Sequence, residues 1–153
     1  MDKKELSQKI ADALRVYVED PAKRCANPAG GCFYDKDMVA HDTPGCLVGA
    51  MIPHELASLL DTGINPAGPI DMILRSLRRW KAENNYPREL DLMPDFIINN
   101  GRLFSKLQTL HDVPSNWTRE GISVHGREAL SEIIDDFELD REPFMDLLTT
   151  KEV

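Results

Sequence analysis

Long hydrophobic runs are missing from this chain of 153 residues, and cationic side chains are fewer than anionic ones. No apolar stretch approaches the ~18 residues that suggest a membrane-spanning helix. The first residues, 1–5, lack the apolar centre of a signal peptide, so we expect a cytoplasmic protein without a membrane partner. Lysine and arginine number 18 against 26 aspartates and glutamates, for a net charge of −8. Because binding to nucleic-acid backbones depends on cations, direct nucleic-acid binding is not expected.

Cysteine is also scarce, since the chain has three. An odd number argues against a secreted scaffold held by disulfides and favours reduced, partly buried thiols. Hydrophobic residues make up 42% of the chain and charged residues 29%, which is typical of globular rather than disordered proteins. At this length we expect a single globular domain, residues 1–153, with a hydrophobic core of its own.

Apolar residues recur at helical spacing along most of the chain, as Leu6, Ile10 and Leu14 do near its start. Two short apolar segments, residues 32–34 and 46–51, break this pattern and are separated by a polar loop with turn residues. They predict a short antiparallel hairpin. The expected fold is α+β and α-dominated, with about six helices around this two-stranded β element. The expected helices cover about residues 3–19, 53–60, 69–80, 101–110, 126–139 and 140–148.

The negative charge is concentrated near the C-terminal end of the chain. Residues 128–146 hold eight acidic side chains and one basic side chain, that of Arg141. An acidic face of this kind either keeps the protein soluble or binds a basic protein surface. The residues that we expect on a partner-binding face are Glu132, Asp135, Asp136 and Glu138.

Three short motifs lie outside the acidic segment. They read Cys-x-Tyr, Gly-Cys-x-x-Gly-x-x-Ile-Pro and Leu-Gln-x-x-His-Asp, and their residues are Cys32, Tyr34, Cys46, Val48, Gly49, Ile52, Pro53, Leu107, Gln108, His111 and Asp112. With them the chain resembles, over about residues 5–140, an uncharacterised family of small proteins from bacteria, cyanobacteria and bacteriophages. It departs from that outline in residues 35–45, a longer and more polar loop. The resemblance implies a shared core and a phage or prophage setting, and it brings no activity.

These observations favour a non-enzymatic accessory protein of phage or prophage type that binds and modulates a host protein. Counter-defence is one such role, and the partner is not identified by the sequence. One alternative is a small-molecule or nucleotide-binding protein (a sponge) that uses glycine- and proline-rich loops and an arginine-bearing helix. Neither loop matches a P-loop or a dinucleotide fingerprint. The ligand-binding residues in this alternative are Asn65, Gly68, Arg75, Arg78 and Arg79.

A second alternative is an enzyme that depends on cysteine and histidine. Cys32 or Cys46 would be the nucleophile and His111 the base. Asp112 is a poor third member, because neighbouring side chains on a helix point ~100° apart. We therefore expect Asp112 not to reach the His111 ring.

Metal binding is not expected, and neither is a cofactor. The chain contains no Cys-x-x-Cys and no His-x-x-x-His pair, the close spacings that are common in zinc sites. The residues of suitable type are Cys25, Cys32, His41, Cys46 and His54.

Overall fold

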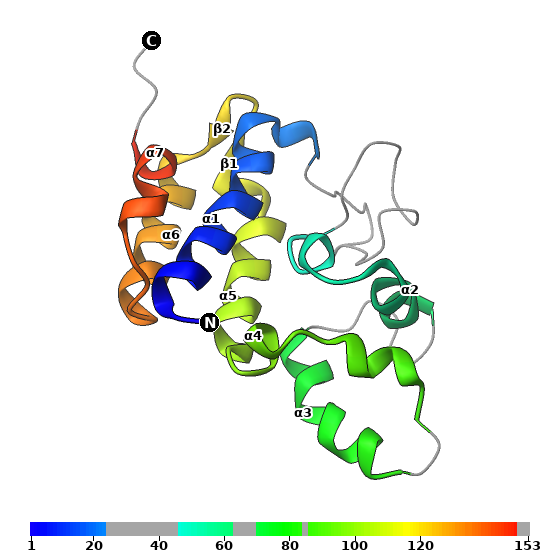
Figure 1. Cartoon of the computed structure of the whole chain (residues 1–153). Coiled ribbons are helices and arrows are strands. Elements are labelled where there is room, and N and C mark those ends of the chain that lie inside the picture. Colours follow the sequence, from blue (N-terminus) through cyan, green and yellow to red (C-terminus); the bar gives the residue numbers. More distant parts are fainter. Residues whose placement is uncertain (24–45, 63–69, 84–85, 150–153) are drawn as a thin grey trace.

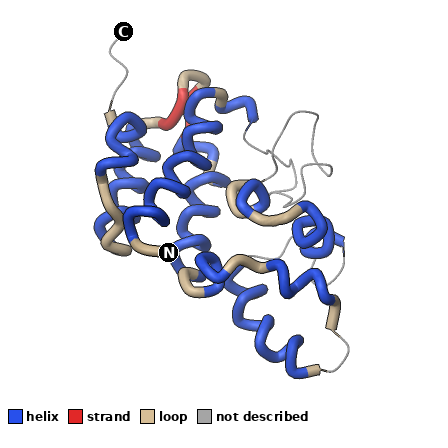
Figure 2. The backbone as a smooth tube through the Cα atoms, viewed as in Figure 1, coloured by secondary structure: helices blue, strands red, loops and turns tan. Residues whose placement is uncertain are grey.

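The computed structural model describes residues 1–23, 46–62, 70–83 and 86–149. Within these ranges the regular elements are helices and one short hairpin, so the expected α-dominated α+β class is confirmed (Figures 1 and 2). The α-helices are α1 (Lys3–Glu19), α2 (His54–Thr62), α3 (Ile70–Ala82), α4 (Asp95–Ile98), α5 (Gly101–Asp112), α6 (Val124–Asp136) and α7 (Met145–Leu148). The strands are β1 (Trp117–Thr118) and β2 (Gly121–Ile122). Short 3-10 helices cover Pro21–Lys23, Gly49–Met51, Arg88–Leu92, Pro114–Asn116 and Glu142–Phe144.

Helix α1 is amphipathic, and its start is set by Asp2. The Asp2 carboxylate accepts a hydrogen bond of 2.8 Å from the Glu5 backbone N–H, which satisfies one of the free donors of the first turn. The buried side of α1 includes Leu6, Ile10 and Tyr17. It packs against α7 and the hairpin, while α5 packs against both α3 and α6. Figure 1 shows α5 between α3, at the lower end of the view, and α6, at the left.

The β element lies elsewhere in the chain than the sequence predicts. The expected strand at residues 46–51 is wrong, because residues 46–48 form a turn and Gly49–Met51 a 3-10 helix. Three consecutive side chains of this run, those of residues 46–48, are buried, whereas a half-buried strand alternates. The other expected strand, residues 32–34, lies outside the described residues. The observed pair is β1–β2, in which Trp117 lies opposite Ile122.

Helix α6 begins and ends earlier than the expected range of 126–139. The Ser123 side chain accepts a hydrogen bond of 3.0 Å from the Gly126 backbone N–H and so caps its first turn. At its other end, the Glu138 N–H donates to the Asp135 carbonyl at 3.2 Å and the Leu139 N–H to the Ile134 carbonyl at 2.9 Å. These two bonds form a Schellman motif. The expected helix at 140–148 is divided into the 3-10 helix Glu142–Phe144 and α7.

Helix α1 is also tied to the C-terminal elements by polar contacts. The Arg15 guanidinium bonds both carboxylate oxygens of Asp146, at 3.0 and 3.1 Å, and this holds the pKa of Asp146 below its ordinary value. The Ser7 hydroxyl accepts from the Asp140 N–H at 2.8 Å. Lys3 donates to the Phe137 carbonyl, just beyond the end of α6. The end of α6 is thereby fixed against the start of α1.

Candidate functional site

The four acidic residues predicted to bind a partner lie on α6 and the turn that follows it. All four side chains are exposed. We call Glu132, Asp135, Asp136 and Glu138 the acidic face. Asp135 pairs with Arg141 at 2.7 Å, and its carboxylate remains 69% exposed. In the part of the chain that the structure describes, no ion pair engages the other three carboxylates.

The position of these charges is unfavourable for the stability of α6. A helix carries partial negative charge at its C-terminal end, and each carboxylate placed there costs about 0.3–1 kcal/mol. Asp135, Asp136 and Glu138 lie at that end, and the last turn holds no basic residue. Lys3 and Arg141 offset part of the repulsion through the contacts described above. The acidic face therefore makes no favourable contribution to the stability of α6.

Glu138 occupies a backbone conformation that the sequence did not indicate. Its φ angle is +54°, in the left-handed region that glycine usually supplies at this point of a Schellman motif. The absence of glycine there removes the usual signal for the end of a helix. The Schellman hydrogen bonds hold this residue in place two positions after Asp136.

One of the two nucleophiles proposed in the enzyme alternative, Cys46, is buried and accepts two hydrogen bonds. Its sulfur accepts hydrogen bonds from the Gly49 backbone N–H at 3.3 Å and from the Gln108 amide at 3.7 Å. Gln108 also accepts from the Ile70 N–H at 3.2 Å, so it joins the turn at Cys46 to the start of α3. Burial raises the pKa of the Cys46 thiol to about 12. The thiol is therefore neutral near pH 7 and is not an activated nucleophile.

His111 belongs to the same region of the core and is fully buried. Its Nδ1 lies 2.9 Å from the Asp112 carboxylate, so the expectation that Asp112 cannot reach the ring is wrong. The angle of ~100° describes the directions of the Cα–Cβ bonds, and both side chains extend far enough to meet beyond them. The Tyr17 ring packs edge-on against His111 at 4.6 Å, and burial raises the pKa of its hydroxyl. Cys32, the other proposed nucleophile, lies outside the described residues.

The residues of the small-molecule alternative are only partly described. Arg75, Arg78 and Arg79 lie together on the exposed side of α3, and Arg75 is 3.9 Å from Asp71. Asn65 and Gly68 lie outside the described residues.

The candidate zinc ligands are divided in the same way. No group of three or more potential ligands within residues 1–23, 46–62, 70–83 and 86–149 could hold a metal ion. Cys25, Cys32 and His41 are not among these residues.

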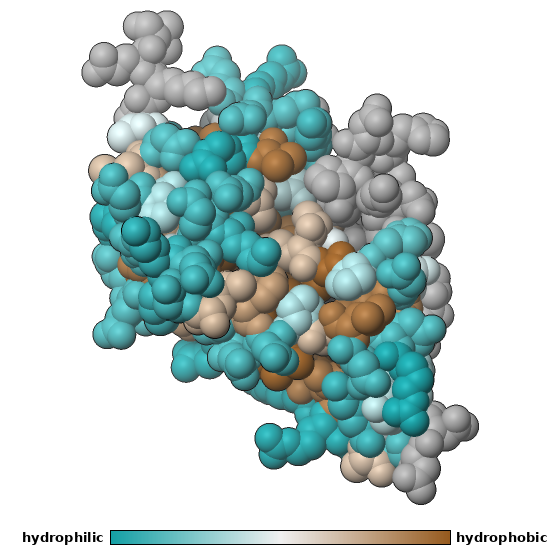
Figure 3. Space-filling model, viewed as in Figure 1, coloured by the Kyte–Doolittle hydropathy of each residue, from teal (hydrophilic) through white to brown (hydrophobic). Residues whose placement is uncertain are grey.

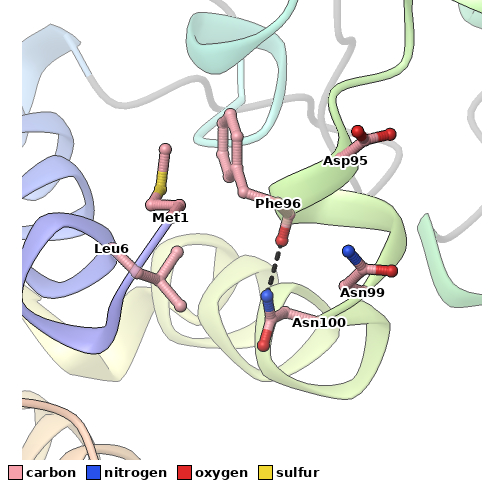
Figure 4. Close-up of a pocket in the computed structure, with 6 residues that line it drawn as sticks. All are labelled: Met1, Leu6, Asp95, Phe96, Asn99 and Asn100. Atoms are coloured by element: carbon pink, nitrogen blue, oxygen red, sulfur yellow. Dashed lines mark hydrogen bonds between the residues drawn. The ribbon is translucent and has the colours of Figure 1, made fainter.

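Two hollows were not anticipated from the sequence. The first, of about 260 Å³, lies between the start of α1 and α4; Met1 and Leu6 line one side and Phe96 and Asn100 the other (Figure 4). Apolar side chains also gather near the middle of the face shown in Figure 3. The second is an open groove of about 600 Å³ between the end of α1, the hairpin, the start of α6 and α7. It is lined by acidic and basic side chains, including Glu19 and Arg127, so the groove favours neither an anionic nor a cationic ligand.

Comparisons of the chain with models of protein families, with curated proteins and with solved structures give no match. None of the described helices has the length and apolar character needed to cross a bilayer.

Proposed function

We propose that this chain is a non-enzymatic binding protein whose acidic face contacts a basic surface on a partner protein. One observation carries the proposal: exposed carboxylates are clustered at the C-terminal end of α6, where the helix dipole opposes them. Natural sequences break such local rules mainly at functional sites. A charged surface that served solubility alone would be equally effective at positions that do not destabilise a helix.

The partner class that we propose is a host protein bound by a phage or prophage product. This step rests on the resemblance stated above and on the sign of the charge. Proteins that bind nucleic acid present basic surfaces, so a nuclease of a defence system has a surface of suitable chemistry. The Cys/His-dependent enzyme has less support, because the Cys46 thiol is neutral and buried.

Reversal of the acidic face is expected to abolish partner capture while the fold becomes more stable. The variant is Glu132→Lys, Asp136→Lys and Glu138→Lys, which leaves the bond between Asp135 and Arg141 in place. Cations at a helix C-terminus are favourable, so the free energy of unfolding should rise by about 1 kcal/mol. Affinity capture from a bacterial lysate, quantified by mass spectrometry, should show at least a tenfold loss of the partner, and urea unfolding should show the gain in stability.

A matched control carries the same change in net charge at distant positions. Glu19, Glu55 and Glu89 are exposed and lie outside the acidic face, and their replacement by lysine should leave capture within twofold of the wild type. Equal loss of capture in both variants would show that capture depends on net charge alone and would overturn the proposal. The proposal also fails if the wild type captures no protein specifically from the lysate.

A further inference from the structure

Helix α3 carries a basic surface that the proposed function does not use. Arg75, Arg78 and Arg79 project from one side of this helix, and all three are exposed. We call them the basic face. Arg75 has a contact of 3.9 Å with Asp71, while Arg78 and Arg79 make no ion pair with any described residue. The opposite side of α3 is buried through Ile70, Ile73 and Leu77, so the arginines cannot turn toward the core.

The exposed sides of α3 and α6 match in length and in the order of their residues. Each helix has 13 residues, which corresponds to about 20 Å. Along one side of α3 the exposed residues include Met72, which is 52% exposed, then Arg75 and Arg79. Along one side of α6 the exposed residues include Val124, which is 63% exposed, then Glu128, Glu132 and Asp136. In a parallel arrangement, Met72 meets Val124, and Arg75 and Arg79 meet Glu128 and Glu132 within about one residue of register.

The two helices cannot meet within one chain. In Figure 1, α3 lies at the lower end of the molecule and α6 along the left side, with α5 packed against both. A complementary surface for the basic face is therefore available on another molecule.

We propose that the basic face of α3 in one copy binds the exposed acidic side of α6 in a second copy. This inference rests on the proposed function, because it uses the same acidic face, and it makes the second copy a competitor of the basic partner protein. The contact is heterologous, so it leaves one free face at each end and permits further copies to add. The net charge of −8 opposes association, which makes the contact weak and sensitive to salt.

Analytical ultracentrifugation over a series of protein concentrations tests the association at low ionic strength. The weight-average mass of the wild type is expected to rise with concentration. It should stay at the monomer value in the variant Arg75→Glu, Arg78→Glu, Arg79→Glu and in the variant Glu132→Lys, Asp136→Lys, Glu138→Lys. The variant with all six changes has complementary faces again and the wild-type net charge, so it should associate as the wild type does.

Mixing the variant with the reversed basic face and the variant with the reversed acidic face should also restore association. The glutamates on α3 of the first variant are then complementary to the lysines on α6 of the second. A wild type that is monomeric at all concentrations overturns the inference. Association that persists in either triple variant also overturns it, and so does the absence of association in the variant with all six changes. Measurement of partner capture distinguishes a failure of this inference from a failure of the proposed function. The basic-face variant should keep full capture, so loss of self-association with intact capture in that variant supports both proposals. Failure of self-association in the wild type with intact capture overturns only the inference.

Discussion

The substitution Gly126→Ala is expected to lower the free energy of unfolding by about 3 kcal/mol, the upper end of the range for overpacked sites. A Cβ atom at this position would lie 2.3 Å from the Asn116 carbonyl oxygen and 2.6 Å from Cγ1 of Ile122. The Asn116 carbonyl cannot easily move, because it accepts a hydrogen bond of 2.8 Å from the Ser123 N–H. Relief of the clash therefore requires a shift of the first turn of α6 away from its cap.

Gly101→Ala is the matched control, since it also adds one methyl group to a glycine at the start of a helix. Its Cβ would lie 3.1 Å from Cδ1 of Leu74, the end of a side chain that can adjust. Alanine is also a better helix former than glycine by about 1 kcal/mol, so stability should change by less than about 1 kcal/mol. Urea unfolding followed by circular dichroism measures both variants. Equal stabilities for the two would show that α6 does not approach Asn116 as closely as described.

Alkylation of Cys46 is expected to be at least about 1000-fold slower in the folded protein than in the unfolded chain. Only the thiolate reacts, and burial raises the pKa of this thiol from 9.0 to about 12, which lowers the thiolate fraction near neutral pH by about three powers of ten. Steric protection adds to this effect, because the residue is 1% exposed. A catalytic nucleophile would show the opposite behaviour, with a lowered pKa and rapid labelling.

Iodoacetamide labelling with mass spectrometry of the peptide that contains Cys46 makes this measurement. The same protein in concentrated urea gives the reference rate. Comparison at one pH below and one pH above the ordinary thiol pKa of 9.0 separates thiolate fraction from access, because only above it does the ratio of thiolate fractions change with pH. Rapid labelling of Cys46 in the native protein, at a rate near that of the unfolded chain, would return the enzyme alternative to consideration.

The helices could be predicted because apolar spacing is a direct consequence of one buried side. The ranges 3–19 and 101–110 agree with α1 and α5 to within two residues. The segment 46–51 could not be assigned, because an uninterrupted apolar run lacks the periodicity that separates a strand from a helical turn. The hairpin at Trp117–Ile122 is two residue pairs long, and such short strands have no periodic pattern to detect.

The residues of the candidate site were predicted from the sequence, but their structural setting was not. The density of carboxylates in residues 128–146 indicated an acidic surface, and the predicted residues are exposed. Their conflict with the helix dipole was not visible, because it depends on α6 ending at Asp136 and on the left-handed conformation of Glu138. The contact of His111 with Asp112 depends on side-chain torsions, which sequence spacing does not determine.

Carboxylate labelling of the captured complex tests the central claim most directly, namely that the acidic face is a contact surface. A carbodiimide and an amine modify exposed carboxylates, and mass spectrometry gives the extent at each residue in the free and bound protein. The account predicts that Glu132, Asp136 and Glu138 are protected at least severalfold in the complex, while Glu55 and Glu89 react as in the free protein. Equal modification of the acidic face in the free and bound states would contradict it.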